Sequence, residues 1–194
     1  LSQSSLTSNS SEYFVTLHID VMIIEQSDDD RKFNRGAILN SGYKNAMNSQ
    51  YYRGIIFHDI DLLPSDVMIP FYALGVFNSA YTKSDKKIVH LAHKWGRYAS
   101  LGTGYIGGVT MFETTQFNNI NGFPNYFAGW GGEDDALRER IIAYAKEMNK
   151  DYVDKDDNTI LTDLVDYPAG IPEDSYTDLE GVSTFREKRD ILKA

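Results

Sequence analysis

Apolar positions along the chain form two kinds of pattern, short continuous runs and longer stretches with helical spacing. Continuous runs bounded by polar residues predict buried strands, and they lie at 13–26, 53–64, 85–93 and 105–113. Apolar residues three or four positions apart predict amphipathic helices, and such stretches lie at 33–49, 113–122 and 133–148. Strands that alternate with helices predict an α/β fold with a mostly parallel sheet flanked by helices, followed by an irregular C-terminal region.

Composition narrows the classes of protein to which this chain can belong. It has 194 residues, of which 42% are hydrophobic, and this is enough for one domain with a sizeable core. The Ser-rich residues 1–12 are expected to be disordered, so the single folded domain is expected at 13–194. A net charge of −9 without a basic stripe argues against nucleic acid as the main partner. The chain has no cysteine, which excludes disulfides and thiol nucleophiles, and no apolar run long enough for a transmembrane helix.

A pair of acids follows the apolar part of the second predicted strand. Asp59 and Asp61 in "HDID" are two residues apart, so both side chains are expected on the same side at the carboxyl end of the strand. Ligands of open α/β sheets sit at this edge, and two carboxylates there repel each other unless a cation neutralises them. Oxygen ligands of this kind suit Mn²⁺ or Mg²⁺, which can bridge a diphosphate. The alternative is an Asp pair that caps the following turn.

A Trp between glycines comes directly before an acid cluster at the start of the predicted helix 133–148. An acid at a helix start is commonly a cap, but Glu133, Asp134 and Asp135 exceed that need. Trp130 offers a flat apolar face that can carry a sugar ring while nearby carboxylates bind the sugar hydroxyls. A carboxylate aimed at a hydroxyl can also act as a general base. The alternative is a core Trp beside a tight turn.

Two further motifs are weaker. "GTGYIG" at 102–107 matches the dinucleotide-binding glycine pattern, but strand-like residues follow it where a helix is required. Its glycines are therefore expected to allow close backbone approach. "DKDDN" at 154–158 has calcium-loop spacing, but Thr159 and Val165 stand where Gly and Glu are needed. A solvated acidic loop is the expected interpretation, and a calcium-stabilised structural domain is the alternative.

A series of motifs in a fixed order resembles the β-1,4-galactosyltransferase family. "GYIGGV", "NGFPN" and "GWGGEDD" are similar to that family's Tyr-Phe-Gly-Gly-Val, Asn-Gly-Phe-Pro-Asn and Gly-Trp-Gly-Gly-Glu-Asp-Asp segments. "FNR" and "HDID" resemble its Phe-Asn-Arg and Asp-Val-Asp segments. The resemblance runs from about residue 17 to about residue 142. It implies a GT-A fold, with one catalytic domain over 13–194.

The resemblance also implies an activity, a metal-dependent, inverting transfer of a hexose from a UDP-sugar to a hydroxyl of an oligosaccharide or glycoconjugate. The transferred hexose is expected to be galactose, because Tyr105 stands at the position that bears on galactose versus N-acetylgalactosamine. For the compartment, it implies the Golgi lumen if the source is eukaryotic and the cytoplasm if it is bacterial.

Site residues follow from the same motif matches. The implied donor-binding residues are Phe33, Arg35, Asp59, Tyr105, Trp130 and Gly131. The implied acceptor-binding residues are Trp130, Gly132 and Asp135. Asp134 would be the general base with Glu133 beside it, and Asp61 would bind Mn²⁺ or Mg²⁺.

Two departures from the family pattern leave an alternative open. The family's N-terminal uracil-binding strand and loop have no counterpart in this sequence, so either the chain is a fragment or its nucleotide pocket is incomplete. A downstream His ligand of the metal has no counterpart either, because all four histidines precede the acid cluster. The family spacing gives Asp163 as its substitute, with Asp157 and Asp166 as rivals. The alternative function is a catalytically inactive carbohydrate-binding module on the same fold.

Overall fold

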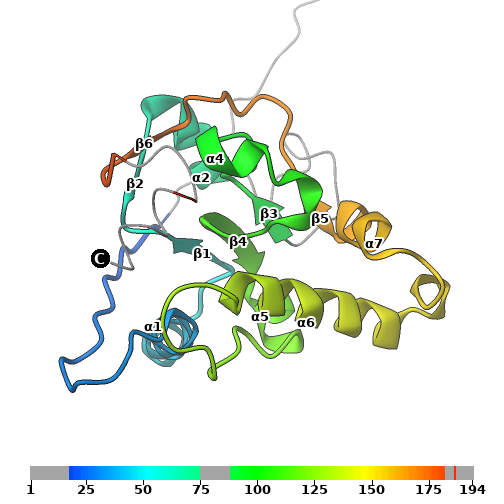
Figure 1. The fold of residues 1–194 in the computed structure, drawn as a ribbon, viewed down its shortest axis with the longest axis horizontal. Helices are drawn as coiled ribbons and strands as arrows, with labels where there is room; N and C mark the ends of the chain where they lie inside the picture. The colour runs from blue at the N-terminus through cyan, green and yellow to red at the C-terminus, as the bar shows by residue number, and fades with distance from the viewer. Residues whose placement is uncertain (1–17, 75–87, 182–185, 187–194) are drawn as a thin grey trace, which may run out of the picture.

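The computed structural model describes residues 18–74, 88–181 and 186, and the segment 1–12 that was expected to be disordered lies outside them. Figure 1 shows the arrangement of the helices and strands. In chain order they are α1 (Arg35–Ser49), β1 (Gly54–His58), β2 (Leu62–Pro64), η1 (Asp66–Met68), α2 (Ile69–Leu74), β3 (Ile88–His90), α4 (Gly96–Ala99), η2 (Gly102–Gly104), β4 (Val109–Glu113), α5 (Thr114–Asn119), α6 (Glu133–Met148), η3 (Lys150–Tyr152), α7 (Asp157–Leu164), β5 (Val165–Asp166) and β6 (Tyr176–Asp178), where η marks a short 3₁₀ helix.

The larger sheet has four strands in the order β1-β4-β3-β5. β4 runs antiparallel to both of its neighbours, with His58 opposite Val109 and Ile88 opposite Phe112, whereas β5 runs parallel to β3. The α/β class is confirmed, but the expected mostly parallel pairing is wrong for the described strands. β1, β3 and β5 do share one direction, and β4 lies between two of them in the opposite direction. An apolar run in a sequence carries no information on strand direction.

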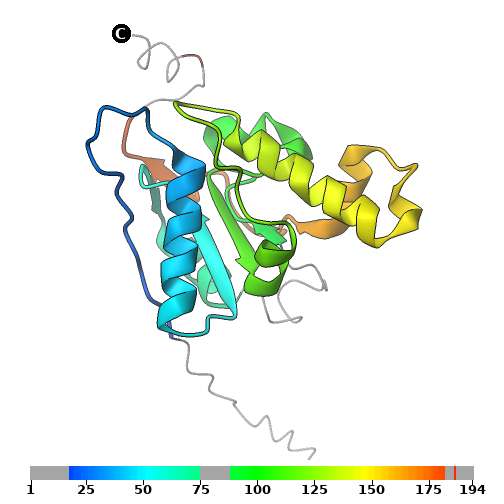
Figure 2. The same ribbon diagram turned by 90° about the horizontal axis from the view of Figure 1, so that it is seen from below.

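Alternation of side chains along the strands divides the core into two halves. On one face Phe57, Ile88 and Phe112 pack with residues of α5, α6 and α7. On the other face Val89 and Met111 pack with the aromatic residues around α4. Figures 1 and 2 show the same division, with α1, α5 and α6 on one side of the sheet and α2 and α4 on the other. Both faces of the four-stranded sheet are therefore covered by helices.

The predicted strand 53–64 divides into two strands of different sheets. The chain turns after β1, where Leu62 N donates to Asp59 O at 3.2 Å, and β2 then pairs antiparallel with β6 in a two-stranded sheet. In this register Leu62 lies opposite Asp178. The two acids of "HDID" therefore lie on a turn between two sheets.

The predicted strand 13–26 is not formed in its described part, residues 18–26. Val21 and Ile23 are 87% and 78% exposed, so the apolar run is not buried. Ile24 is the residue that reaches the helix beside it, because a Cβ at Gly42 of α1 would lie 2.8 Å from its Cγ1. Residues 18–26 show no ladder with another described strand, so this apolar run lacks the partner that a strand needs.

The predicted helices are confirmed to within a few residues. α1 covers most of 33–49, and Asn34 caps it by accepting from Ala37 N at 2.9 Å. α6 spans the predicted 133–148, with three acids in its first turn and Lys146 in its last, as suits the helix dipole. α5 lies within the predicted 113–122.

The two weaker motifs have local structural roles. Residues 102–107 pass through η2 and lead into β4 rather than into a helix. Asp156 of "DKDDN" caps α7, because its carboxylate accepts from Thr159 N at 3.0 Å. Neither motif therefore has the context of the binding site that its spacing suggests.

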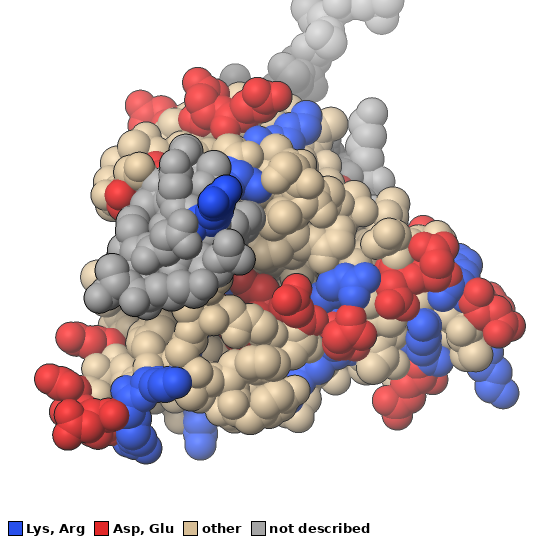
Figure 3. Space-filling view, in the orientation of Figure 1, with Lys and Arg blue, Asp and Glu red and all other residues tan. Residues whose placement is uncertain are grey.

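The molecular surface carries charges of both signs. Figure 3 shows acidic and basic side chains next to one another over α6 and α7 on this face. Within the part of the chain that the structure describes, no helix combines the length and hydropathy needed to cross a membrane.

Candidate functional site

Three segments that are far apart in the sequence meet at the side chain of Arg35. Arg35 begins α1, Asp59 follows β1, and Glu133 and Asp134 begin α6. The guanidinium donates to Asp59 Oδ1 at 2.5 and 3.0 Å, to Asp134 Oδ1 at 2.9 Å and to Glu133 Oε1 at 3.4 Å. These four residues are called the Arg35 cluster below. The fold thus brings together four of the residues that the sequence predicts for donor binding and base catalysis.

Two glycines allow close packing at the first turns of α1 and α6, which carry the residues of this cluster. Gly36 lies against Pro124, where a Cβ would be only 2.3 Å from the carbonyl oxygen. Gly132 precedes α6 with a φ of 94°, in the left-handed region, and a Cβ there would lie 2.6 Å from the Phe127 ring. Larger residues at either position would displace the helix start that carries the charged side chains.

Burial governs the charges of the Arg35 cluster. Burial raises the pKa of Asp59 and of Asp134, and the Arg35 guanidinium opposes this rise without cancelling it. For Arg35 itself burial lowers the pKa, but the carboxylates of Asp134, Asp59 and Glu133 raise it, and the net shift is upward. Burial is the largest cause of the raised pKa of Asp134, and the charges of its neighbours Glu133 and Asp135 add to it. A carboxylate with a raised pKa is suited to accepting a proton from a hydroxyl.

Two tyrosines and a stretch of backbone complete the surroundings of Asp134. Tyr105 OH lies 3.5 Å from Asp134 Oδ2, and Tyr98 OH lies 3.4 Å from Asp59 Oδ2. The two tyrosine rings pack together with centroids 4.9 Å apart. Gly107 lies against the same groups, since a Cβ on it would be 2.1 Å from Asp134 Oδ2 and 2.3 Å from Tyr105 OH. Tyr105, which the sequence connects with donor choice, therefore faces the predicted base directly.

His90 is a residue of this site that the sequence analysis missed. Its ring is buried, and Nε2 lies 2.9 Å from Gly107 O, so this nitrogen carries the proton and donates to the carbonyl. Burial lowers the pKa of His90 to about 3, which keeps the ring neutral at physiological pH. The ring therefore fixes the peptide that lies against Asp134. A polar ring inside the apolar run "IVHLA" is the signal that could have identified it.

Trp130 faces solvent and is not a core residue. It is 51% exposed, and Gly129 and Gly131 on either side have φ values of 100° and 95°. The core-Trp alternative is therefore excluded. Phe33 is also 51% exposed, and its carbonyl accepts from Gly129 N at 2.7 Å, which joins the start of α1 to the Trp130 loop. Asp135 is exposed on the first turn of α6.

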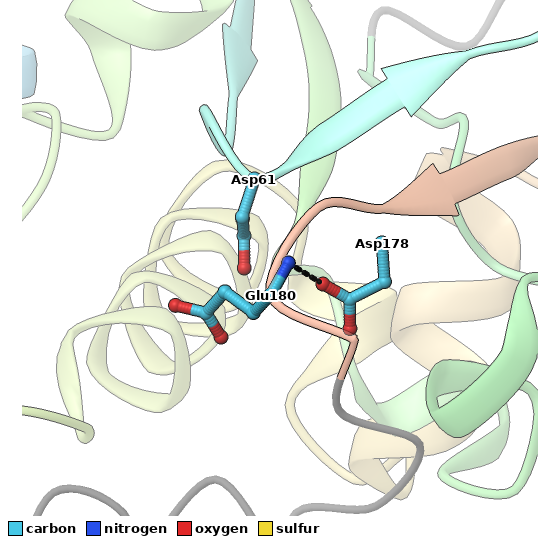
Figure 4. Close-up of side chains that lie close together, drawn as sticks. All are labelled: Asp61, Asp178 and Glu180. Carbon is cyan, nitrogen blue, oxygen red and sulfur yellow. Dashed lines mark hydrogen bonds between the residues drawn. The ribbon is translucent and has the colours of Figure 1, made fainter.

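Asp61 belongs to a second group of acids, called the Asp61 cluster below. One carboxylate oxygen from each of Asp61, Asp178 and Glu180 lies within 4.8 Å of the others. Figure 4 shows Asp61 on the turn that leads into β2, and the other two acids at the end of β6. The pairing of β2 with β6 brings these acids together. One more backbone hydrogen bond extends the pairing, from Leu179 N to Asp61 O at 2.7 Å. Glu180 N donates to Asp178 Oδ1 at 2.9 Å.

The predicted second metal ligand, Asp163, does not belong to this cluster. It lies on α7 with its carboxylate 3.1 Å from Lys155 Nζ. Of its rivals, Asp157 pairs with Lys146 at 3.1 Å and Asp166 lies on β5. The structure does not bring Asp163 to Asp61, because η3, α7 and β5 follow α6 and the described chain reaches Asp61 again at β6.

The donor set of the Asp61 cluster fits a hard divalent cation, because its three carboxylates offer the oxygen ligands that Mn²⁺ and Mg²⁺ accept. Arg97 lies beside it, with Nη1 2.7 Å from Asp178 Oδ2 and Nη2 3.6 Å from Asp61 Oδ2. Three carboxylates and one guanidinium leave a formal charge of −2, which one divalent cation balances.

Comparison with known proteins gives two family matches. The model described as the N-terminal region of glycosyl transferase group 7 matches residues 15–72, and the model described as the N-terminal domain of galactosyltransferase matches residues 87–158. Human β-1,4-galactosyltransferase 4 is 36% identical over 125 residues, which are 64% of this chain and 33% of that protein. Human β-1,4-galactosyltransferase 6 is 38% identical over 120 residues, or 61% of this chain and 28% of that protein. The chain thus spans about a third of the length of these relatives.

Solved structures show the same likeness. The catalytic domain of Drosophila β-1,4-galactosyltransferase 7 in complex with xylobiose aligns with a TM-score of 0.54 and 23% identity, covering 86% of this chain and 63% of that one. A mutant of the Drosophila protein in complex with manganese, UDP-Gal and xylobiose aligns with a TM-score of 0.54 and 22% identity. At these identities the likeness establishes the fold, and the expected GT-A class is confirmed.

Proposed function

Because this chain belongs to the glycosyltransferase group 7 family, which includes the β-1,4-galactosyltransferases, we propose that it serves the metal-dependent, inverting transfer of galactose from UDP-galactose to a sugar hydroxyl. One observation carries the proposal. A single turn after β1 directs Asp59 to the Arg35 cluster and Asp61 to the Asp61 cluster, whose third carboxylate, Glu180, is exposed. The proposed base site and the proposed cation site would thus be joined by one short turn, which suits transfer from a sugar diphosphate.

The Arg35 cluster would supply the base. Inversion needs one in-line displacement, in which a base removes the proton from the acceptor hydroxyl as its oxygen attacks the sugar carbon. Asp134 suits this role because it is held by Arg35 at 2.9 Å and burial raises its pKa. Glu133 would help to orient the substrates. Tyr105 would favour galactose over N-acetylgalactosamine. Its side chain already fills the space beside Gly107, so the larger acetamido group would fit there less well than a hydroxyl.

The exposed aromatic loop before α6 would bind the sugars. Trp130 presents its ring to solvent between two glycines with positive φ, and the apolar face of a sugar can stack on such a ring. Gly131 would face the donor, and Gly132 and Asp135 would face the acceptor. Phe33, tied to this loop through its carbonyl, would contact the nucleotide.

The Asp61 cluster would hold Mn²⁺ or Mg²⁺ through Asp61, Asp178 and Glu180, and the last two replace Asp163 in this role. A divalent cation there supplies the positive charge that neutralises the departing diphosphate, so no acid is needed on that side. The supporting observations are the oxygen donor set and the formal charge of −2.

The proposal is tested by measuring transfer from UDP-galactose to a panel of β-linked mono- and disaccharides, with Mn²⁺ or with EDTA. The expected result is a galactosylated product that forms only with the divalent cation and forms less well from UDP-N-acetylgalactosamine. Glycan binding that is indifferent to UDP and EDTA, without product, would instead support the inactive carbohydrate-binding module. The absence of both product and UDP binding would refute the proposal.

A further inference from the structure

Arg97 is held rigidly beside the Asp61 cluster. Its side chain is only 3% exposed, and its guanidinium lies over the rings of Trp95 and Tyr98, 5.2 and 5.4 Å from their centroids. Both rings are themselves buried in the core. A guanidinium packed in this way cannot move far from the carboxylates beside it.

The carboxylates that Arg97 contacts come from segments that are far apart in the sequence. Asp61 follows β1 and Asp178 ends β6, and their side chains are 12% and 11% exposed. The β2–β6 backbone pairing already holds the two chain segments together. What Arg97 adds is therefore charge rather than backbone position.

The charge of Arg97 has opposite effects on the metal-free site and on a bound cation. Without a cation, three carboxylates within 4.8 Å repel one another, and the nearby guanidinium offsets part of this repulsion. With a cation, the same guanidinium repels the incoming positive charge. Both effects are strong in a partly buried site, where charges are screened less than in water.

We propose that Arg97 is a built-in counter-ion of the cation site, which stabilises the Asp61 cluster when it is empty and weakens its affinity for a divalent cation. The cation then binds tightly only when a ligand such as a diphosphate adds further negative oxygens. This proposal rests on the proposed function, since it takes the Asp61 cluster as the cation site.

The variant Arg97→Met tests the proposal, because methionine fills similar apolar space between Trp95 and Tyr98 without a charge. The metal-free variant should melt at a lower temperature than the wild type. Its Mn²⁺ dissociation constant, measured by calorimetry without nucleotide, should fall at least tenfold, and Mn²⁺ should raise its Tm by more than it raises that of the wild type. Arg138→Met is the matched control, because Arg138 pairs with Glu139 and Asp157 instead, and it should leave the Mn²⁺ affinity unchanged.

A double-mutant cycle without metal tests the counter-ion role separately from cation binding. Asp178→Asn should lower the Tm less in the Arg97→Met background than in the wild type, because its charge is already uncompensated there. Additive effects of the two substitutions would show that Arg97 only fills space, and would overturn the proposal. If Arg97→Met does not fold, Arg97→Lys keeps the charge and should keep the Mn²⁺ affinity within a few-fold of the wild type.

The remaining outcomes separate this proposal from the proposed function. Binding of Mn²⁺ by Arg97→Met but not by the wild type would support the counter-ion strongly. An affinity that is the same in both proteins, or weaker in the variant, would contradict it. If neither protein binds Mn²⁺ but UDP-dependent transfer persists, the cation-site assignment fails and the inference with it, while the transferase proposal stands without that site.

Discussion

The Arg35 cluster has three carboxylates and one arginine, and so does the Asp61 cluster when Arg97 beside it is included, but the contacts differ. In the Arg35 cluster the guanidinium contacts all three carboxylates, and burial raises the pKa of two of them. In the Asp61 cluster Arg97 contacts two of the three, and Glu180 is exposed to solvent.

This difference indicates that the contacts of the arginine and the exposure of the third carboxylate, more than residue type, decide what an acid cluster can do. A closed cluster whose carboxylates have raised pKa values is suited to accepting a proton. An open cluster with an exposed carboxylate and an uncompensated charge of −2 is suited to exchanging a cation. The turn after β1 places one aspartate in each cluster, so two residues of one short motif would take part in different chemistry.

Removing the base should have the largest effect. Asp134→Asn keeps the shape of the side chain but cannot accept a proton, so kcat for transfer should fall by about 10³-fold. UDP binding, measured by calorimetry, should stay within a few-fold of the wild type. Glu139→Gln on the exposed side of the same helix is the control. A variant that retains its kcat would show that the base is another residue.

Removing the arginine of the closed cluster should have the next largest effect, and it falls on stability. Arg35→Met leaves the buried carboxylates of Asp59, Glu133 and Asp134 without their counter-ion, and should lower the free energy of unfolding by about 3–5 kcal/mol. Urea denaturation followed by circular dichroism measures this change. Arg31→Met is the matched control, because Arg31 pairs with Asp29 at the surface, and it should leave stability unchanged. Equal effects of the two substitutions would contradict the distinction between closed and exposed pairs.

Removing a ligand of the open cluster should have a smaller effect, confined to the cation. Asp178→Asn should weaken Mn²⁺ binding by about tenfold to a hundredfold, because a neutral amide replaces a charged ligand. Calorimetry with Mn²⁺ alone measures the affinity. Asp163→Asn is the control, since Asp163 pairs with Lys155 on α7, and it should bind Mn²⁺ as the wild type does. The reverse result would restore Asp163 as the ligand.

The effect that is smallest at neutral pH concerns His90, and it grows as the pH falls. Burial lowers the pKa of His90 to about 3 in the folded protein, against an ordinary value of 6.5, so the unfolded chain takes up a proton first as the pH falls. The stability that the neutral ring contributes is complete above pH 6.5 and is lost progressively towards pH 3. His90→Gln retains a donor for Gly107 O and does not titrate. The free energy of unfolding of the variant, relative to that of the wild type, should therefore rise as the pH falls below 6.5. Denaturation curves of both proteins at pH 7, 6, 5 and 4 measure this change. A difference in the free energy of unfolding that is the same at all four pH values would contradict a buried neutral ring.

Much of the Arg35 cluster could be predicted from the sequence because its parts lie in local motifs. Asp59 ends a short apolar run, and Glu133 and Asp134 start a helix with clear periodicity, so the element boundaries alone locate them. Their meeting at Arg35 requires the tertiary packing of α1 against the 123–132 segment, which periodicity does not encode. The resemblance to a known family assigned all four residues to the substrate site, but their contacts with Arg35 are seen only in the structure.

The Asp61 cluster could be predicted only in part. Asp61 lies in a motif, but Asp178 and Glu180 reach it through a strand of three residues that has too little periodicity to be recognised. The antiparallel direction of β4 could not be predicted either, because strand direction depends on the connection and on the neighbouring strands. His90 was missed because a histidine in an apolar strand looks like a core residue until the carbonyl that it contacts is known.

The most direct test of the division between the two clusters is calorimetric titration of UDP, with and without Mn²⁺, into the wild type, Asp134→Asn and Asp178→Asn. Mn²⁺ should strengthen UDP binding in the wild type and equally in Asp134→Asn, whereas Asp178→Asn should lose this strengthening. If Asp134→Asn loses Mn²⁺-dependent UDP binding while Asp178→Asn keeps it, the assignment of base and cation to separate clusters is wrong.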